Sequence, residues 1–342
     1  MKPLTVLATA PSGPLEEFEP LRAAGLDVVI GRPLGMKDRR PWSEADLIEA
    51  VRAADIVLAS SFERISRAVM TPAERLQLVI VPFIGVDKIE VPAATDLGVL
   101  VANSPTPENF VGVAEATVML ILMLQKRVKH NEAKVRAGGW GGREDRGEFL
   151  FDKTVGLVGL GRVGSRVARR LAGWDARLLA CDPYIDPSKA TDVGATLVDL
   201  PTLLAEADVV SLHVSLTDET RGMIGEKQLR AMKPTAVLLN TARGEVVDEA
   251  AVARAVDEKW IAGAALDAFV REPLEADSPL RRVDPERMIL TPHNIAHSEA
   301  GRRANLKLAL DQILAVARGE PPAHLINPDA VPRWRTRTAT RR

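Results

Sequence analysis

The chain has 342 residues, which is too many for one domain of ordinary size and suits two. Its 45 lysines and arginines balance 46 aspartates and glutamates, so bulk charge attracts neither nucleic acid nor an anionic membrane, and we expect neither as a partner. A single cysteine, Cys181, excludes an intrachain disulfide framework and fits a reducing cytosol. No secretory signal is convincing, so we expect a cytoplasmic protein, and we expect no metal site.

The first hundred residues alternate short apolar runs with helical segments. We expect strands at 4–9, 27–30, 55–59, 78–81 and 99–101, and helices at 14–24 and 43–53, with Ser43 as a helix cap. This alternation predicts a parallel sheet with helices on both faces. Because no glycine phosphate loop is present here, we expect this domain to bind something other than a dinucleotide.

A long helix is expected from Glu108 to about Arg136, after a proline-rich break. Its apolar run at 111–124 contains Glu115 and is shorter than the roughly 20 residues that span a bilayer, so it predicts a buried helix. The run holds more apolar residues than one buried face requires. We therefore predict a homodimer built on this helix and the Gly/Trp loop at 138–142.

Residues 153–164 carry the strongest motif, a short buried strand that runs into a G-x-G-x-x-G turn and a helix. Gly159 permits the tight turn, Gly161 lets the backbone approach a pyrophosphate, and Gly164 lets helix and strand pack closely. A second apolar run closes on Asp182, about 20 residues further on, where a carboxylate accepts hydrogen bonds from the adenosine ribose. Strand, turn, helix, strand and acid in this order predict dinucleotide binding. Asp182 favours NAD over NADP, because a 2′-phosphate would meet like charge.

Three polar stretches follow later strands, which we expect at 209–213, 236–240, 263–266 and 288–290. Arg243 suits a bidentate clamp on a carboxylate, and His293 suits proton exchange with a substrate hydroxyl. Glu272 would orient such a histidine and favour its charged form. Taken singly, each could be a surface ion-pair residue, a solvated acid or a satisfied strand-end histidine. Together, behind a dinucleotide loop, they indicate an active site.

These stretches resemble the D-isomer-specific 2-hydroxyacid dehydrogenase family over nearly the whole chain. The similarity lies in GLGRVGSRVA, CDPY, LHVSLTDETRGMI, LNTARGEVVDEAA, ALDAF, REPL and LTPH. The family resemblance implies an α/β protein with two doubly wound parallel-sheet domains, a flavodoxin-like substrate domain and a Rossmann NAD-binding domain. We expect residues 1–103 with 298–330 in the first, residues 104–297 in the second, and a basic, disordered tail at 331–342.

The resemblance also implies the activity and its residues. The catalytic trio would be Arg243, Glu272 and His293, and the reaction would interconvert a D-2-hydroxy acid and its 2-keto acid with NAD, in a cleft between the domains. Positions that match cofactor contacts, together with those of the glycine turn, are Thr117, Gly159, Gly161, Arg162, Val163, Gly164, Asp182, His213, Thr241, Ala242 and Asp267. Positions that match the substrate loop are Phe83, Ile84 and Gly85, with Arg243.

Several departures from the family pattern concern the substrate more than the reaction. Phe83 stands where a glycine is usual, so it would restrict the size of the acid if it points into the pocket. His297 is the one rival to His293 as the catalytic histidine, whereas His130 is interpreted as a surface residue. Two alternatives stay open: a formate or phosphite dehydrogenase on the same framework, or an NAD-sensing, corepressor-like interaction protein.

Overall fold

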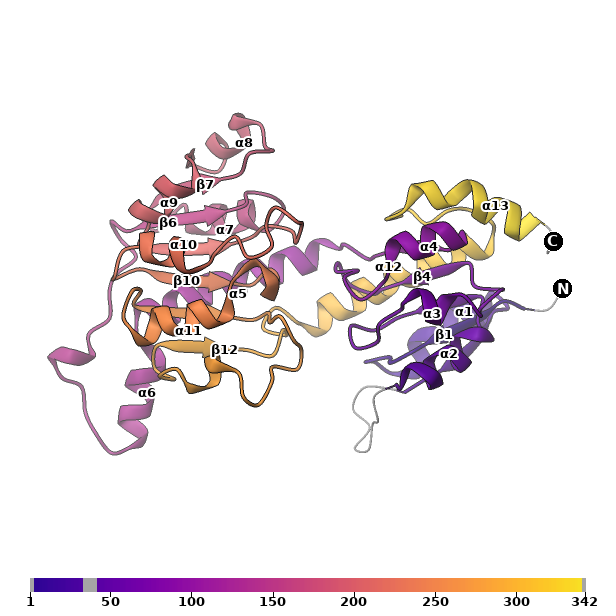
Figure 1. Ribbon diagram of the computed structural model, residues 1–342, viewed down its shortest axis with the longest axis horizontal. Coiled ribbons are helices and arrows are strands. Elements are labelled where there is room, and N and C mark those ends of the chain that lie inside the picture. The colour runs from indigo at the N-terminus through magenta and orange to yellow at the C-terminus, as the bar shows by residue number, and fades with distance from the viewer. Residues whose placement is uncertain (1–2, 33–41, 340–342) are drawn as a thin grey trace. The chain divides into compact units, whose positions relative to one another are not determined.

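The computed structural model describes residues 3–32 and 42–339 and contains two compact units (Figure 1). The first unit comprises residues 1–109 and 298–342, and the second unit comprises residues 110–297. Each unit contains one sheet whose strand pairs are all parallel. The predicted fold class, two doubly wound α/β domains, is confirmed.

The sheet of the first unit has the order β2-β1-β3-β4-β5, which is the flavodoxin-like order 2-1-3-4-5. Its strands are β1 (Thr5–Ala8), β2 (Asp27–Ile30), β3 (Ile56–Leu58), β4 (Leu78–Ile80) and β5 (Leu100–Ala102). All five were expected, with ends that differ by at most a residue or two.

Alternate residues of these strands enter two separate cores, because successive side chains in a strand point to opposite faces. Val6 and Ala8 join the core under α12 (Glu299–Ala317), whereas Leu7 joins the core under α2 (Glu44–Arg52). The first core also receives Phe18, from a 3₁₀ turn, and α1 (Glu19–Ala23), and the second receives α3 (Arg67–Met70) and α4 (Val91–Leu97). Ser43 caps α2 as predicted, its Oγ accepting a hydrogen bond from the amide of Asp46 at 3.1 Å.

The tail prediction is wrong for residues 331–339, which form α13 (Val331–Ala339) after a 3₁₀ turn, η5 (Pro328–Ala330). Trp334 is only 1% exposed and joins the core under α12. Arg333 and Arg337 donate hydrogen bonds to the carbonyls of Asp96 and Leu97, at the end of α4. These arginines of the basic segment thus provide hydrogen bonds for carbonyls at the C-terminal end of a helix. Residues 340–342 lie outside the described part of the chain.

The sheet of the second unit has the order β12-β11-β10-β9-β6-β7-β8. Read from β8 this is the Rossmann order 3-2-1-4-5-6 with one further strand. The strands are β6 (Thr154–Val158), β7 (Arg177–Cys181), β8 (Ala195–Leu197), β9 (Val209–Leu212), β10 (Val237–Asn240), β11 (Gly263–Leu266) and β12 (Met288–Leu290). The strand order reverses between β6 and β9, which is where such sheets bind ligands.

Helices cover both faces of this second sheet. One face packs on α5 (Pro107–Gln125), α7 (Gly164–Leu171) and α8 (Pro187–Thr191), through residues that include Ala114, Val167 and Ala190. The opposite face packs on α9 (Leu200–Glu206), α10 (Glu226–Ala231) and α11 (Glu249–Asp257), through residues that include Leu203, Leu229 and Val252. The loops at the carboxyl ends of the strands are therefore held by a sheet that is buried on both faces.

The long helix expected at 108–136 is two helices, α5 and α6 (Val128–Arg136). Arg127 breaks the helix because its φ is +50°, in the left-handed region. The chain returns to this point, and the amide of Glu148 donates to the carbonyl of Gln125 at 2.7 Å. This contact satisfies one of the carbonyls left free at the end of α5.

By length and mean hydropathy, α5 is long and apolar enough to cross a membrane. Its inner face nevertheless packs into the second unit, where Ala114, Leu120 and Ile121 are fully buried against the sheet. A core helix passes the same test of length and composition. The expected buried helix is therefore present, with an outer face that carries Met119 at 42% exposure.

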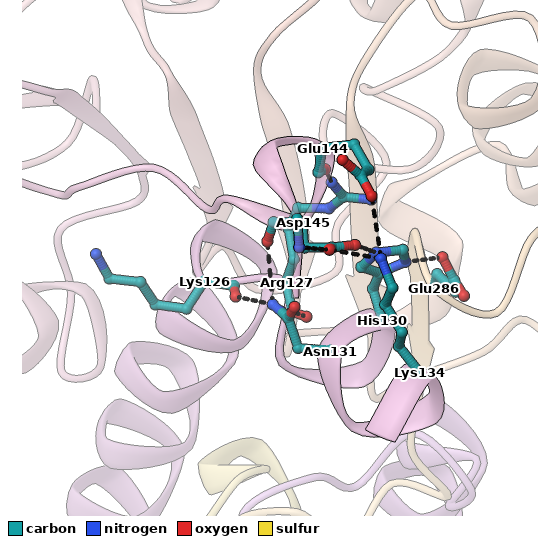
Figure 2. A network of polar contacts seen from close by, with 9 residues as sticks. Lys126, Arg127, His130, Asn131, Lys134, Glu144, Asp145 and Glu286 are labelled. Atoms are coloured by element: carbon teal, nitrogen blue, oxygen red, sulfur yellow. Dashed lines mark hydrogen bonds and ion pairs between the residues drawn. The ribbon is translucent and has the colours of Figure 1, made fainter. Parts of the chain in front are cut away.

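His130 is not a simple surface residue, because it connects α6 to two carboxylates (Figure 2). Its Nε2 lies 2.6 Å from Asp145 Oδ1, and its Nδ1 contacts Glu286. Lys134 donates to the second oxygen of Asp145 at 2.6 Å. Asp145, followed by Glu286, raises the pKa of His130. These contacts fasten α6 and the 3₁₀ turn η2 (Arg143–Asp145) to the loop before β12.

Candidate active site

The glycine turn after β6 has the geometry that its sequence predicts. Gly159 has a φ of +94°, and a Cβ there would lie 2.8 Å from the carbonyl of His213. A Cβ on Gly164 would lie 2.1 Å from the carbonyl oxygen of Gly159, so only glycine permits this approach of α7 to the strand. A Cβ on Gly161 would meet nothing within 4 Å. Open space beside Gly161, at a helix N-terminus, fits a pyrophosphate.

Asp182 follows β7 and lies beside the same turn. Its Oδ2 accepts the amide of Leu160 at 2.9 Å, and its Oδ1 accepts the amide of Tyr184 at 3.0 Å. These bonds fix the carboxylate and leave lone pairs for a ribose. His213, after β9, contacts the hydroxyl of Ser211 at 3.0 Å, and desolvation lowers the pKa of His213 to about 4. A neutral His213 adds no charge beside the glycine turn, against which it lies.

The three predicted catalytic residues follow three neighbouring strands. Arg243 comes after β10, Glu272 lies in the loop after β11, and His293 comes after β12. Parallel strands place their carboxyl ends at one edge of the sheet, so these loops lie side by side. The positions agree with the sequence prediction, whereas the chemical roles of the three residues stay predictions.

Glu272 and His293 are in direct contact. His293 Nδ1 lies 2.7 Å from Glu272 Oε1, which also accepts the amide of Phe269 at 3.1 Å. Their side chains are 32% and 41% exposed, so both remain open to solvent or a ligand. His293 has a φ of +53°, an uncommon backbone conformation for a residue with a side chain, and such strain is frequent at functional sites.

Neighbouring charges separate the two candidate histidines. The hydrogen bond that His293 makes to Glu272 raises the pKa of His293 against desolvation, and the charges of Glu272 and Asp267 act in the same direction. Arg243 lies near enough for its charge to lower the pKa of His293. Desolvation, and then the charge of His293, lower the pKa of His297. His293 is therefore the histidine whose cation the site favours.

Asp267 ties the β11 loop to the β12 loop. It is 5% exposed, and its Oδ1 accepts the hydroxyl of Thr291 at 2.6 Å and the amide of Asn294 at 3.2 Å. Desolvation raises the pKa of Asp267. These bonds hold the backbone on both sides of His293. Thr291 was not among the predicted site residues, although a hydroxyl just before the histidine is visible in the sequence.

The loop that carries Arg243 is shaped by Asn240, the last residue of β10. The fully buried Asn240 side chain donates to the carbonyl of Arg243 at 2.8 Å and accepts the amide of Ala242 at 3.0 Å. Arg243 Nη1 donates to the carbonyl of Ala242 at 2.8 Å. Asn240 was also not predicted as a functional residue, because a strand-end asparagine has an ordinary role in turns.

The remaining predicted positions fall into two groups. In the second unit, Thr117 Oγ1 lies 3.2 Å from Thr241 Oγ1, and the Arg162 guanidinium lies 5.2 Å from the centre of the Phe110 ring. Val163 is the N-cap residue of α7, directly before the helix begins at Gly164. In the first unit, Phe83, Ile84 and Gly85 follow β4, and the ring of Phe83 packs partly on the core under α2. Binding roles for all of these stay predictions.

A Rossmann-ordered sheet, an open glycine turn and a histidine–carboxylate pair at the strand ends define a dinucleotide-dependent dehydrogenase. The family model for "D-isomer specific 2-hydroxyacid dehydrogenase, NAD binding domain" matches residues 118–294. This chain belongs to the D-isomer-specific 2-hydroxyacid dehydrogenase family, and it is an NAD-dependent oxidoreductase that acts on CH–OH donors. The residues around the turn fit NAD, which would lie on Gly161 and Asp182.

The matches extend beyond the NAD-binding domain. A glyoxylate reductase from Korarchaeum cryptofilum is 38% identical, over 86% of this chain and 89% of its own length. A D-3-phosphoglycerate dehydrogenase from Methanocaldococcus jannaschii is 36% identical over 85% of this chain, but over only 55% of its own length. A solved structure from Thermus thermophilus has a TM-score of 0.84 and 32% identity, and covers 94% of this chain and 100% of its own.

Proposed function

We propose that this enzyme interconverts a D-2-hydroxy acid and its 2-keto acid, with Arg243, Glu272 and His293 as its catalytic trio. The observation that carries the proposal is the contact of 2.7 Å between His293 and Glu272. A charged-form histidine held by a carboxylate is the arrangement that exchanges a proton with a substrate oxygen. It occurs in the same unit as the dinucleotide turn.

His293 would act through its second ring nitrogen. Because Nδ1 faces Glu272, Nε2 is the nitrogen available to the substrate oxygen. In reduction, protonated His293 gives its proton to the carbonyl oxygen as the carbonyl carbon is reduced, and in oxidation neutral His293 takes that proton back. Bound NADH supplies the hydride. Glu272 keeps the imidazole oriented and favours its cation.

Arg243 would hold the substrate carboxylate. A guanidinium offers two parallel N–H groups in a planar fork that matches a carboxylate, and its charge stabilises the negative charge that develops on the carbonyl oxygen. Asn240 fixes the backbone at this residue, so the fork is presented from a rigid loop. Positioning of this kind reduces the entropy lost on the way to the transition state.

Formate oxidation is favoured less by this arrangement. Removing a hydride from formate gives carbon dioxide and releases no hydroxyl proton, so it has no use for a histidine–glutamate pair. Oxidation of a hydroxy acid releases one proton from oxygen in each turnover. Solved formate dehydrogenases share the fold with this chain, at 23% and 24% identity. At that identity the likeness supports the fold alone.

For the substrate, we propose a small 2-keto acid, and glyoxylate is the first to test. The glyoxylate reductase of Korarchaeum cryptofilum matches this chain over nearly the length of both proteins. We assign the first unit to substrate binding, through the loop that contains Phe83, Ile84 and Gly85. A phenylalanine at a position where glycine is usual would favour small or flat acids.

A substrate screen tests this function. NADH oxidation is followed with glyoxylate, hydroxypyruvate, pyruvate, longer 2-keto acids and aromatic ones, and NAD reduction is followed with formate and phosphite. We expect turnover with glyoxylate or another small keto acid and none with formate. Turnover of formate or phosphite alone would contradict the proposal. NADH binding with negligible turnover of every acid would instead indicate an NAD-sensing, corepressor-like protein.

We further propose that the enzyme is a cytoplasmic homodimer without a nucleic-acid or membrane partner. The balanced charge supports the absence of those partners. Several large apolar side chains are exposed on α5, on α6 and in the segment that leads to β6, and a group of exposed apolar side chains of this kind is typical of a protein–protein interface. They are Met119, Val128, Val135, Trp140, Phe149 and Phe151, at 42%, 43%, 56%, 84%, 73% and 58% exposure.

A further inference from the structure

The loop after β11, which carries Glu272, is held by two carboxylates through two successive amides. The amide of Phe269 donates to Glu272 Oε1 at 3.1 Å, and the amide of Val270 donates to Glu249 Oε1 at 2.7 Å. The first bond lies within the loop itself. The second connects the loop to a different element, because Glu249 is the first residue of α11.

Glu249 is not needed to begin its helix. The N-cap of α11 is Asp248, whose Oδ1 accepts the amide of Ala251 at 3.0 Å. The carboxylate of Glu249 is therefore available for a contact outside the helix. It makes the hydrogen bond to Val270, a residue 21 positions further along the chain.

The burial and the neighbouring acids of Glu249 disfavour its ionised form. Desolvation raises the pKa of Glu249, the bond from Val270 lowers it, and the charges of Glu245, Glu275 and Glu272 raise it. Ionising a partly buried carboxyl group near other carboxylates costs free energy, unless the ionised form accepts good hydrogen bonds. The amide of Val270 and the N-terminus of α11 provide such compensation.

A second contact joins the same two loops. Gly244 follows Arg243, and a Cβ on Gly244 would lie 2.0 Å from the carbonyl carbon of Phe269 and 2.3 Å from the amide nitrogen of Val270. The Arg243 loop and the Glu272 loop are thus in backbone contact. The bond between Glu249 and Val270 lies beside this contact, so it restrains the backbone from which Glu272 extends.

We propose that Glu249 is a positioning residue for the catalytic pair. By accepting the Val270 amide, its carboxylate fixes the turn from which Glu272 reaches His293. Glu249 acts through the backbone of this turn and need not touch the substrate. This inference rests on the proposed function, because it assigns a role to Glu249 only if Glu272 and His293 exchange the proton.

Two substitutions separate the hydrogen bond from the charge. Glu249→Gln keeps the reach and an acceptor oxygen but removes the charge, whereas Glu249→Asp keeps the charge but shortens the reach. We expect Glu249→Gln to leave kcat for keto-acid reduction within about twofold of wild type. We expect Glu249→Asp to lower kcat roughly tenfold, a loss of the size that one hydrogen bond to a charged group is worth, with KM for NADH unchanged.

The same variants make two further predictions that a merely structural role would not. In Glu249→Asp, the alkaline limb of the pH–rate profile should move to lower pH, because a displaced Glu272 no longer raises the pKa of His293. Hydrogen exchange at the Val270 amide should be faster in Glu249→Asp than in Glu249→Gln. Glu275→Ala is the matched control: it removes an exposed acid of the same loop, which pairs with Arg271 at 2.6 Å, and should leave kcat unchanged.

Three outcomes would overturn the role of Glu249. The first is wild-type kcat in both Glu249 variants. The second is a lowered kcat in Glu249→Gln beside a normal kcat in Glu249→Asp. The third is a loss of kcat in Glu275→Ala equal to that in Glu249→Asp. Glu272→Gln and His293→Ala are measured in the same assays. If those two also retain normal turnover, the proposed function is at fault; if they lose turnover while both Glu249 variants do not, only the positioning role is refuted.

Discussion

At the scale of single residues, one hydrogen bond, between Glu272 and His293, favours the charged form of the imidazole that we propose as the acid–base group. Glu272 raises the pKa of His293, so the cation required for keto-acid reduction persists to higher pH than in an isolated histidine. Reduction should therefore fall on the alkaline side as His293 loses its proton. Oxidation of the hydroxy acid should rise through the same pH range, because it requires neutral His293.

Glu272→Gln should move the alkaline limb of keto-acid reduction to lower pH. The amide keeps the shape of the side chain but removes the charge that favours the cation, so the pKa of His293 falls. We expect a smaller loss of kcat near pH 6 than near pH 8. Pre-steady-state and steady-state pH–rate profiles measure this shift. An alkaline limb that stays at the wild-type pH would show that Glu272 does not raise the pKa of His293.

Asp182 should make the enzyme prefer NADH to NADPH by at least about 100-fold in kcat/KM. The amides of Leu160 and Tyr184 fix its carboxylate beside the glycine turn, where a 2′-phosphate would meet like charge. Asp182→Asn keeps an acceptor oxygen and removes the charge, so it should narrow the preference. Equal efficiency of the wild-type enzyme with both cofactors would contradict this account.

At the scale of elements, the sequence predicted what depends on local pattern. Strands β2, β11 and β12 begin and end at the predicted residues, because each apolar run ends at a polar or glycine boundary. The break between α5 and α6 could not be predicted, since Arg127 is neither glycine nor proline. α13 was missed because three of its nine residues are arginines and Trp334 is its one buried residue.

Most side-chain contacts between elements could not be predicted from the sequence. The order of motifs was enough to predict the glycine turn, Asp182 and the three residues at the strand ends, because the family pattern and sheet topology place them together. The bond from Thr291 to Asp267 and that from Val270 to Glu249 join residues more than 20 positions apart. Neither spacing nor residue type indicates such pairs before the sheet order is known.

Trp334→Ala should destabilise the first unit by about 3–5 kcal/mol, as expected when a fully buried aromatic side chain is removed from a core. Trp334 anchors α13 on the core that also contains Phe18 and Ile313. Arg335→Ala is the control on the same helix: its side chain is exposed, and the change should stay within about 0.5 kcal/mol. Chemical denaturation measures both. Equal stability of the two variants would mean that α13 is not part of the folded core.

At the scale of the whole molecule, the exposed apolar side chains on α5, on α6 and in the segment that leads to β6 predict self-association. Light scattering at micromolar concentration should report twice the 37.0 kDa of one chain. Trp140→Asp should weaken the dimer, because it places a charge in a surface that would be buried. Tyr184→Asp is a control on an equally exposed aromatic residue outside this surface, at 79% against 84% exposure. A wild-type monomer would contradict the prediction.

The most direct test of the account is keto-acid reduction by His293→Ala beside His297→Ala, with NADH binding measured in both. Removing a positioned acid–base group costs roughly 10²–10⁴-fold in rate. His293→Ala should lose turnover on this scale and still bind NADH, because the glycine turn and Asp182 are unchanged. His297→Ala should retain most activity. Near-normal reduction by His293→Ala, with His297→Ala inactive, would contradict the central claim.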